Sequence, residues 1–146
     1  MIAAYYDTNY LFKLQFPENG SGDVQKHSAT LDFIACSLHG RAELISAAHR
    51  KVREGTSSPG SIEAFLAQIE RDTSSGSLFW LPITNREVGR VEDAYRKAPS
   101  TTFLRAADAL HLASAAEQGF TEIYSNDRHL LAAARLFGLR GVNVIR

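Results

Sequence analysis

Short apolar runs alternate with stretches of helical spacing along the whole chain. Five of these runs are predicted to be strands, at residues 2–6, 33–37, 78–83, 122–125 and 142–145. The run at 33–37 is continuously apolar, which is typical of a strand that is covered on both faces. The pattern therefore predicts a sheet buried inside the molecule.

The stretches between these runs carry apolar residues at helical spacing. In 62–69 they fall at positions i, i+3, i+4 and i+7, which is the clearest amphipathic pattern in the chain. Thr84 and Glu87 have the spacing of a capping box, which marks the start of a helix. Helices are predicted at residues 8–14, 24–31, 39–54, 59–71, 84–97, 101–118 and 128–137.

Strands and helices alternate, and every connection between two strands is long enough for a parallel crossover. Such alternation predicts an α/β fold with a central parallel sheet of about five strands and helices on both faces. With 146 residues the chain is expected to form a single domain, residues 1–146.

The composition narrows the class of partner. Lys and Arg together number 16, as do Asp and Glu, so the zero net charge argues against gripping nucleic acid through bulk positive charge. The single cysteine, Cys36, excludes an intrachain disulfide and a cysteine metal cluster. The first apolar run is short and has no basic residues before it, and no run approaches a membrane span. We expect a cytoplasmic protein without membrane contact.

Four acidic residues stand at positions where a parallel sheet collects its ligands. Asp7 and Asp127 directly follow predicted strands. Glu43 lies in the first turn of the helix that follows the predicted strand at 33–37. The carboxyl ends of parallel strands share one edge, where ligands bind in α/β folds. Asp108 lies in the apolar helix 101–118, where a carboxylate is expected to be paired or bound to a ligand.

Each acid also has a purely structural explanation. Asp7 and Asp127 are suited to cap the helices that follow them. Glu43 could interact with a helix dipole, and Arg105 stands three residues before Asp108 as a possible ion-pair partner. The sequence leaves these alternatives open.

Together the four carboxylates would repel one another unless cations or protons were bound. Oxygen ligands without a Cys or His set favour Mg²⁺ or Mn²⁺. Such ions lower the pKa of a bound water and neutralise charge on a phosphodiester, so no side-chain nucleophile is needed. No G-x-S-x-G motif or paired Cys/His site is present.

Four motifs carry a resemblance to the PIN-domain nucleases, and within them to the VapC-like toxins of bacterial toxin–antitoxin pairs. They are YDTN at 6–9, RAEL at 41–44, ADALHLA at 107–113 and YSNDRHL at 124–130. They occur in the order and spacing of the family and span nearly the whole chain.

The resemblance implies a three-layer α/β/α domain and Mg²⁺- or Mn²⁺-dependent cleavage of RNA by an endoribonuclease toxin. It implies a catalytic cluster of Asp7, Glu43, Asp108 and Asp127, in which the three aspartates bind the metal. Thr8 falls where relatives often have Ser or Thr near the metal, and Ser125 is a further neighbour of the pocket. Such toxins are typically homodimers that a cognate antitoxin protein holds inactive.

Basic residues close to the acids are candidates for RNA contact, and Arg105 and Arg128 are the best placed in the sequence. The group Arg86, Arg90 and Lys97 is read primarily as solvated surface, and His111 and His129 as packing or surface residues rather than metal ligands.

Two other functions compete with a nuclease. One is a phosphatase with Asp7 as its nucleophile, although such enzymes usually have a second Asp where this chain has Asn9. The other is a non-catalytic module that uses the acidic pocket only to bind a partner.

Overall fold

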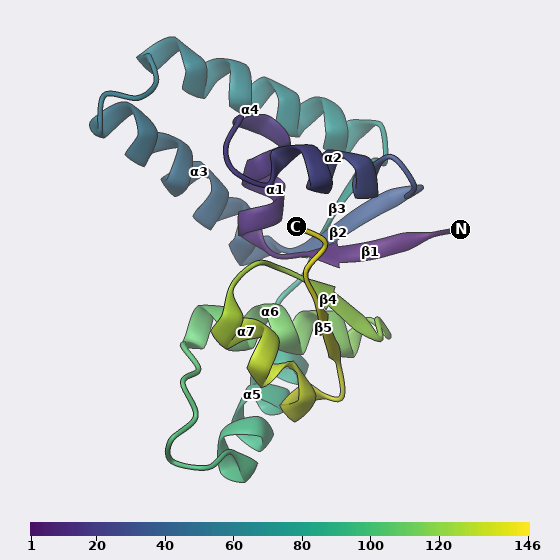
Figure 1. Ribbon diagram of the computed structural model, residues 1–146. Helices are drawn as coiled ribbons and strands as arrows, with labels where there is room; N and C mark the ends of the chain where they lie inside the picture. The colour runs from purple at the N-terminus through teal and green to yellow at the C-terminus, as the bar shows by residue number, and fades with distance from the viewer.

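Five parallel strands form the sheet of the computed structural model, which describes residues 1–146 (Figure 1). Their order across the sheet is β3-β2-β1-β4-β5. The strands are β1 (Ala3–Tyr6), β2 (Phe33–Ser37), β3 (Leu78–Leu81), β4 (Glu122–Tyr124) and β5 (Arg140–Val142). This confirms the predicted α/β fold with a parallel sheet of five strands.

Helices cover both faces of this sheet. They are α1 (Thr8–Gln15), α2 (Ser21–Ser28), α3 (Leu38–Arg53), α4 (Pro59–Ser74), α5 (Asn85–Lys97), α6 (Ala106–Glu117), α7 (Arg128–Ala133) and a 3₁₀ helix, η1 (Ala134–Phe137). Figure 1 shows α1 to α4 on one side of the strands and α5 to α7 on the other. Right-handed crossovers require this division, because the chain moves outward from β1 to β3 and then crosses back to β4 and β5.

The central strand β1 lies where the direction of the chain reverses. The chain leaves β1 for β2 on one side, and β4 later pairs with β1 on the other, with Tyr5 opposite both Ala35 and Ile123. A crevice opens beyond the carboxyl ends of the strands at such a switch point. The residues that follow β1 and β4 therefore face each other across the crevice.

Tyrosine hydroxyls tie the core to the loops around this crevice. Tyr5 and Tyr10 are completely buried, so their hydroxyl groups need partners inside the protein. The Tyr5 hydroxyl accepts from the Ser37 N–H at 2.9 Å. The Tyr10 hydroxyl donates to Asn143 Oδ1 at 2.7 Å and accepts from the Val144 N–H at 2.8 Å. These bonds attach α3 and the C-terminal segment to the central strand and α1.

The predicted elements differ from the structure mainly at their ends, and the helix predicted at 24–31 lies at Ser21–Ser28. The helix predicted at 101–118 begins only at Ala106, because residues 99–102 form a turn in which the Thr102 N–H donates to the Pro99 carbonyl oxygen, and the backbone at Arg105 is extended. The fifth strand occupies Arg140–Val142 rather than 142–145, because the Asn143 side chain turns the chain towards α1. The predicted capping box of Thr84 and Glu87 is present at the start of α5.

Candidate active site

Asp7 ends β1 and caps α1 at the same time. Its Oδ1 accepts from the Tyr10 N–H at 3.2 Å, and its Oδ2 accepts from the Ser125 hydroxyl. The residue is 3% exposed and has no cationic side chain within ion-pair distance. Burial raises the pKa of Asp7 to about 6, although the bonds from Ser125 and Tyr10 act in the opposite direction. A buried carboxylate without a cation is an electrostatic cost to the fold.

The turn after β4 connects Asp7 to Asp127. The Ser125 hydroxyl donates to Asp7 and accepts from the Asp127 N–H at 2.9 Å. Asp127 Oδ1 caps α7 by accepting from the N–H groups of His129 at 2.8 Å and Leu130 at 3.3 Å. Ser125 is fully buried and therefore fixes the two acidic turns relative to each other.

Asp108 lies in the first turn of α6, and a guanidinium group joins it to Asp127. Arg105 Nε is 3.4 Å from Asp108 Oδ2, and its Nη2 is 3.5 Å from Asp127 Oδ2. Burial raises the pKa of Asp108, and the nearby Asp127 adds to this, while Arg105 acts against it. Arg105 thus neutralises part of the charge of two carboxylates that would otherwise repel each other.

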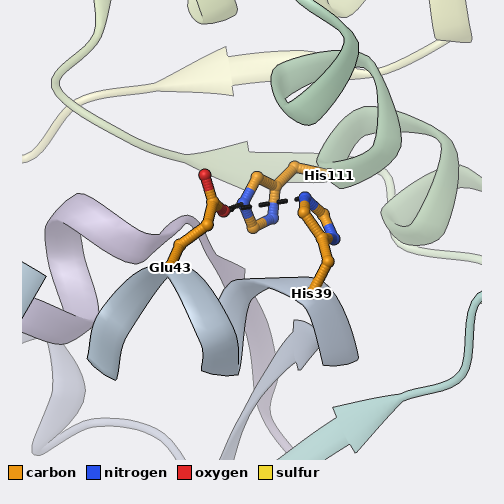
Figure 2. Close-up of side chains that lie close together, drawn as sticks. All are labelled: His39, Glu43 and His111. Atoms are coloured by element: carbon orange, nitrogen blue, oxygen red, sulfur yellow. Dashed lines mark hydrogen bonds and ion pairs between the residues drawn. The ribbon is translucent and has the colours of Figure 1, made fainter. Parts of the chain in front are cut away.

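Glu43 comes from α3 and is bonded to side chains of two other helices. Its Oε1 accepts from Thr8 Oγ1 at 3.0 Å and lies 2.6 Å from His111 Nε2 (Figure 2). Burial raises the pKa of Glu43, but the contact with His111 outweighs it, so the pKa lies below its ordinary value. Because α3 begins at Leu38, Glu43 is beyond its first turn, and the helix-dipole explanation does not apply.

The four predicted acids line one pocket of about 320 Å³. Ten residues form its wall, namely Asp7, Thr8, Asn9, Glu43, Arg50, Arg105, Ala107, Asp108, His111 and Asp127. Only one of them is hydrophobic. The fold thus brings together four carboxylates from α3, α6 and the turns after β1 and β4.

The donor chemistry of this pocket fits a hard divalent cation. Carboxylate oxygens are the preferred ligands of Mg²⁺, and a cation beside Asp7 would offset the electrostatic cost of its burial. The three aspartates are not gathered as tightly as direct ligands of one ion would be. The one group of three possible ligands within 4.8 Å is His39, Glu43 and His111. Arg105 holds Asp108 and Asp127 through its own side chain instead.

Several neighbours of the acids were not identified from the sequence. His111 was read as a packing residue, yet it touches Glu43 and Thr8 as well as being buried. Its position three residues after Asp108, on the same helix face, was the available signal. Arg50 also lines the pocket, and the available signal was its position seven residues, or two helical turns, after Glu43 on α3.

The other predicted basic residues lie in different surroundings. Arg86 and Arg90 form ion pairs with Glu117, at 3.5 Å and 2.5 Å, and do not line the acidic pocket. Arg128 is exposed beside Asp127 and forms no ion pair. None of the helices combines the length and apolar character that crossing a membrane requires.

Comparison with known proteins gives the same picture of the fold. VapC20 of Mycobacterium tuberculosis, described as a sarcin–ricin loop cleaving toxin, aligns with a TM-score of 0.69 and 19% identity, over 89% of this chain and 94% of VapC20. FitAB, solved bound to a DNA fragment, contains a chain that aligns with a TM-score of 0.61 and 13% identity, over 98% of this chain and 96% of that one. No curated protein sequence gives a significant match.

The sequence pattern of one protein family spans most of the chain. The match covers residues 4–136, from the central strand β1 to the 3₁₀ helix after α7, and so includes all four acids of the pocket. The strand order and the carboxylates at the switch point agree with the resemblance found in the sequence motifs. The chain belongs to the PIN domain family.

Proposed function

We propose that this PIN-domain protein is a metal-dependent endoribonuclease that acts as the toxin of a toxin–antitoxin pair. Asp7, Glu43, Asp108 and Asp127 form its catalytic cluster, and the three aspartates bind Mg²⁺ or Mn²⁺. The ion would supply an activated water and neutralise charge on the scissile phosphodiester.

One observation carries this proposal. Asp7 is a buried carboxylate without a cationic side chain, and it faces a polar pocket whose wall holds three more carboxylates. A bound cation would stabilise the charged form of this carboxylate. Buried ionisable groups with a shifted pKa are common at functional sites. The phosphatase alternative has less support, because such enzymes usually have a second Asp where this chain has Asn9.

The residues of the pocket have separate tasks in this scheme. Ser125 and the Tyr10 N–H hold the Asp7 carboxylate in one orientation, so that a ligand bound by it has a fixed position. Thr8 and His111 hold Oε1 of Glu43 in the same way. The Glu43 side chain is 37% exposed, which makes it the acid best able to accept a hydrogen bond from water at the substrate.

Positive charge beside the acids supports a polyanionic substrate. Arg50 and Arg105 line the pocket, and Arg128 is exposed next to Asp127. Arg105 now contacts Asp108 and Asp127, and if these two acids held a metal ion instead, its guanidinium would be available for a phosphate group. Because the net charge of the chain is zero, we infer that these local cations make the contacts with the RNA phosphates.

The partners of the chain follow from the same proposal. The substrate is RNA, a cognate antitoxin protein holds the enzyme inactive, and two copies form a homodimer. The similarity to VapC20, a toxin that cleaves the sarcin–ricin loop, supports RNA as the substrate class. The similarity to a chain of FitAB agrees with a protein that works in a complex.

Cleavage of total RNA by the purified chain tests the proposal. Mg²⁺, Mn²⁺ and EDTA are compared, with Asp108→Asn as the inactive variant and Asp93→Asn, an exposed acid on α5, as the matched control. We expect discrete fragments that require metal, persist with Asp93→Asn and disappear with Asp108→Asn. Equal cleavage by wild type and Asp108→Asn would reject the assignment, and metal binding without turnover would favour a non-catalytic pocket.

A further inference from the structure

A second group of possible metal ligands lies beside the acidic pocket. His39 and Glu43 stand one turn apart on α3, and His111 reaches them from α6 (Figure 2). One ligand atom from each of the three lies within 4.8 Å of the others. This set differs from the aspartates because two of its three donors are imidazole nitrogens.

The separations of these donors suit a small transition-metal ion. Glu43 Oε1 lies 2.6 Å from His111 Nε2 and 3.6 Å from His39 Nε2. Ligands at about 2.0–2.1 Å around a tetrahedral Zn²⁺ stand about 3.3–3.4 Å from one another. The two observed distances lie on either side of that value and all three donor atoms lie within 4.8 Å of one another, so shifts of up to about 1.4 Å would place them at three corners of a tetrahedron.

Both imidazole rings are also held from behind, as in known zinc sites. His111 Nδ1 lies 2.7 Å from the Tyr5 hydroxyl, and His39 Nδ1 lies 2.5 Å from Ser37 Oγ. Metal-binding histidines almost always donate the N–H of their second nitrogen in a hydrogen bond, which fixes the ring and its tautomer. His111 Nε2 is left facing Glu43, and His39 Nε2 lies near both Glu43 and the Ala107 carbonyl oxygen.

The backbone of α3 is fitted closely against His111. A Cβ atom added at Gly40 would lie 2.5 Å from Cys36 Sγ and 3.0 Å from His111 Cε1. Only a glycine therefore allows the first turn of α3, which carries His39, to approach the buried ring. The close approach is an observation independent of the donor distances.

From these contacts we propose that His39, Glu43 and His111 form a second metal site that takes Zn²⁺ or a similar borderline ion. Imidazole nitrogen favours such ions over Mg²⁺, so the site differs in selectivity from the all-carboxylate pocket. His39 Nε2 now lies 2.9 Å from the Ala107 carbonyl oxygen and exchanges this contact for the ion. The carbonyl belongs to α6 and keeps its helical partner.

The site goes beyond the proposed nuclease function but shares Glu43 with it. An ion held by His39, Glu43 and His111 would withdraw the Glu43 carboxylate from the acidic pocket. Zn²⁺ is therefore expected to inhibit cleavage that Mg²⁺ supports. The binding itself is measured without RNA, so it can fail or succeed independently of the nuclease proposal.

Zn²⁺ titration of the chain without a histidine tag tests the site. Calorimetry is carried out in excess Mg²⁺, and Co²⁺, whose visible spectrum reports tetrahedral coordination, serves as the second probe. We expect one equivalent of Zn²⁺ to bind and to displace Co²⁺. His39→Ala should weaken Zn²⁺ binding at least about tenfold.

The controls separate this site from other ligands. His49→Ala removes an exposed histidine of the same helix, and Asp108→Asn removes a carboxylate of the acidic pocket, so both should bind Zn²⁺ like wild type. His39→Gln, which can still form hydrogen bonds, is the second variant if His39→Ala melts early. No Zn²⁺ binding in excess Mg²⁺, equal binding by folded His39 variants, or loss of binding in Asp108→Asn would each overturn the proposal.

Discussion

Replacing Asp7 with Asn should stabilise the metal-free protein while it removes a carboxylate of the proposed catalytic cluster. The pKa of Asp7 is raised from its ordinary 3.8 to about 6, chiefly by burial. Because the pKa is higher in the folded chain, protonation of Asp7 contributes to the folding stability. This contribution is fully present below pH 3.8 and is lost as the pH rises through about 6. At pH 7 the folded chain therefore holds a charged carboxylate that the unfolded chain would solvate better.

The size of the effect follows from this pKa. One pKa step corresponds to about 1.4 kcal/mol, so a charged Asp7 costs the fold about 3 kcal/mol at pH 7. Asn lacks the charge, is an equally good helix cap and can still accept from the Tyr10 N–H. Its NH₂ group would replace Oδ2, which now accepts from Ser125 and Asn9, so about 3 kcal/mol is the upper limit of the gain. Asp7→Asn should gain up to about 3 kcal/mol at pH 7 and only about half of that at pH 5, where the wild-type carboxyl is mostly protonated.

Urea unfolding in EDTA at pH 5 and pH 7 measures both values. Asp93→Asn, at an exposed position of α5, is the matched control and should change stability little at either pH. Mg²⁺ at 100 times its Kd should stabilise wild type by about 2.7 kcal/mol and Asp7→Asn by much less. The reasoning would be refuted if Asp7→Asn were less stable than wild type at pH 7. It would also be refuted if the substitution changed the free energy of unfolding equally at both pH values.

Three further substitutions test packing and RNA binding. Gly40→Ala should cost about 1–3 kcal/mol in urea unfolding because its methyl group meets Cys36 and His111, whereas Gly60→Ala, with no atom within 4 Å, should be tolerated. Ile69→Asp introduces a charge at a position that is 2% exposed and should cost about 4 kcal/mol, so an unchanged melting temperature would contradict the packing described for α4. Arg50→Ala is made in the Asp108→Asn background, which is expected to be inactive, and should weaken RNA binding. The slope of log affinity against log salt concentration should fall by about one, and an unchanged slope would show that Arg50 does not contact RNA.

Local patterns were sufficient to predict the sheet. The strands predicted at 33–37 and 122–125 are short runs bounded by loop or helix-start residues, and the structure has strands at Phe33–Ser37 and Glu122–Tyr124. The position of Asp7 and Asp127 at the carboxyl edge follows directly from that alternation, because parallel strands share one edge. Predictions failed at element ends, as at Ala106, where a long-range partner or a local preference decides the boundary.

The neighbours of the acids could not be predicted in the same way. The contact between Glu43 and His111 joins residues 68 apart, and that between Tyr5 and His111 joins residues 106 apart. Such pairs depend on how α3 and α6 pack against the ends of β1 and β2, which no local pattern records. The spacing of His111 to other histidines does not reveal its relevant neighbour, which is a carboxylate from another helix.

The structural and functional explanations of the aspartates are compatible, because a carboxylate has two oxygens. Asp127 caps α7 with Oδ1, and its Oδ2 faces Arg105. Asp7 caps α1 with Oδ1, while the Ser125 hydroxyl orients Oδ2. A cap fixes the rotamer of its side chain, so capping directs the second oxygen, which Ser125 then holds in Asp7 and Arg105 contacts in Asp127. Evidence that an acid caps a helix at the end of a parallel strand therefore does not argue against a role in the pocket, and in this fold it explains how the acid is held there.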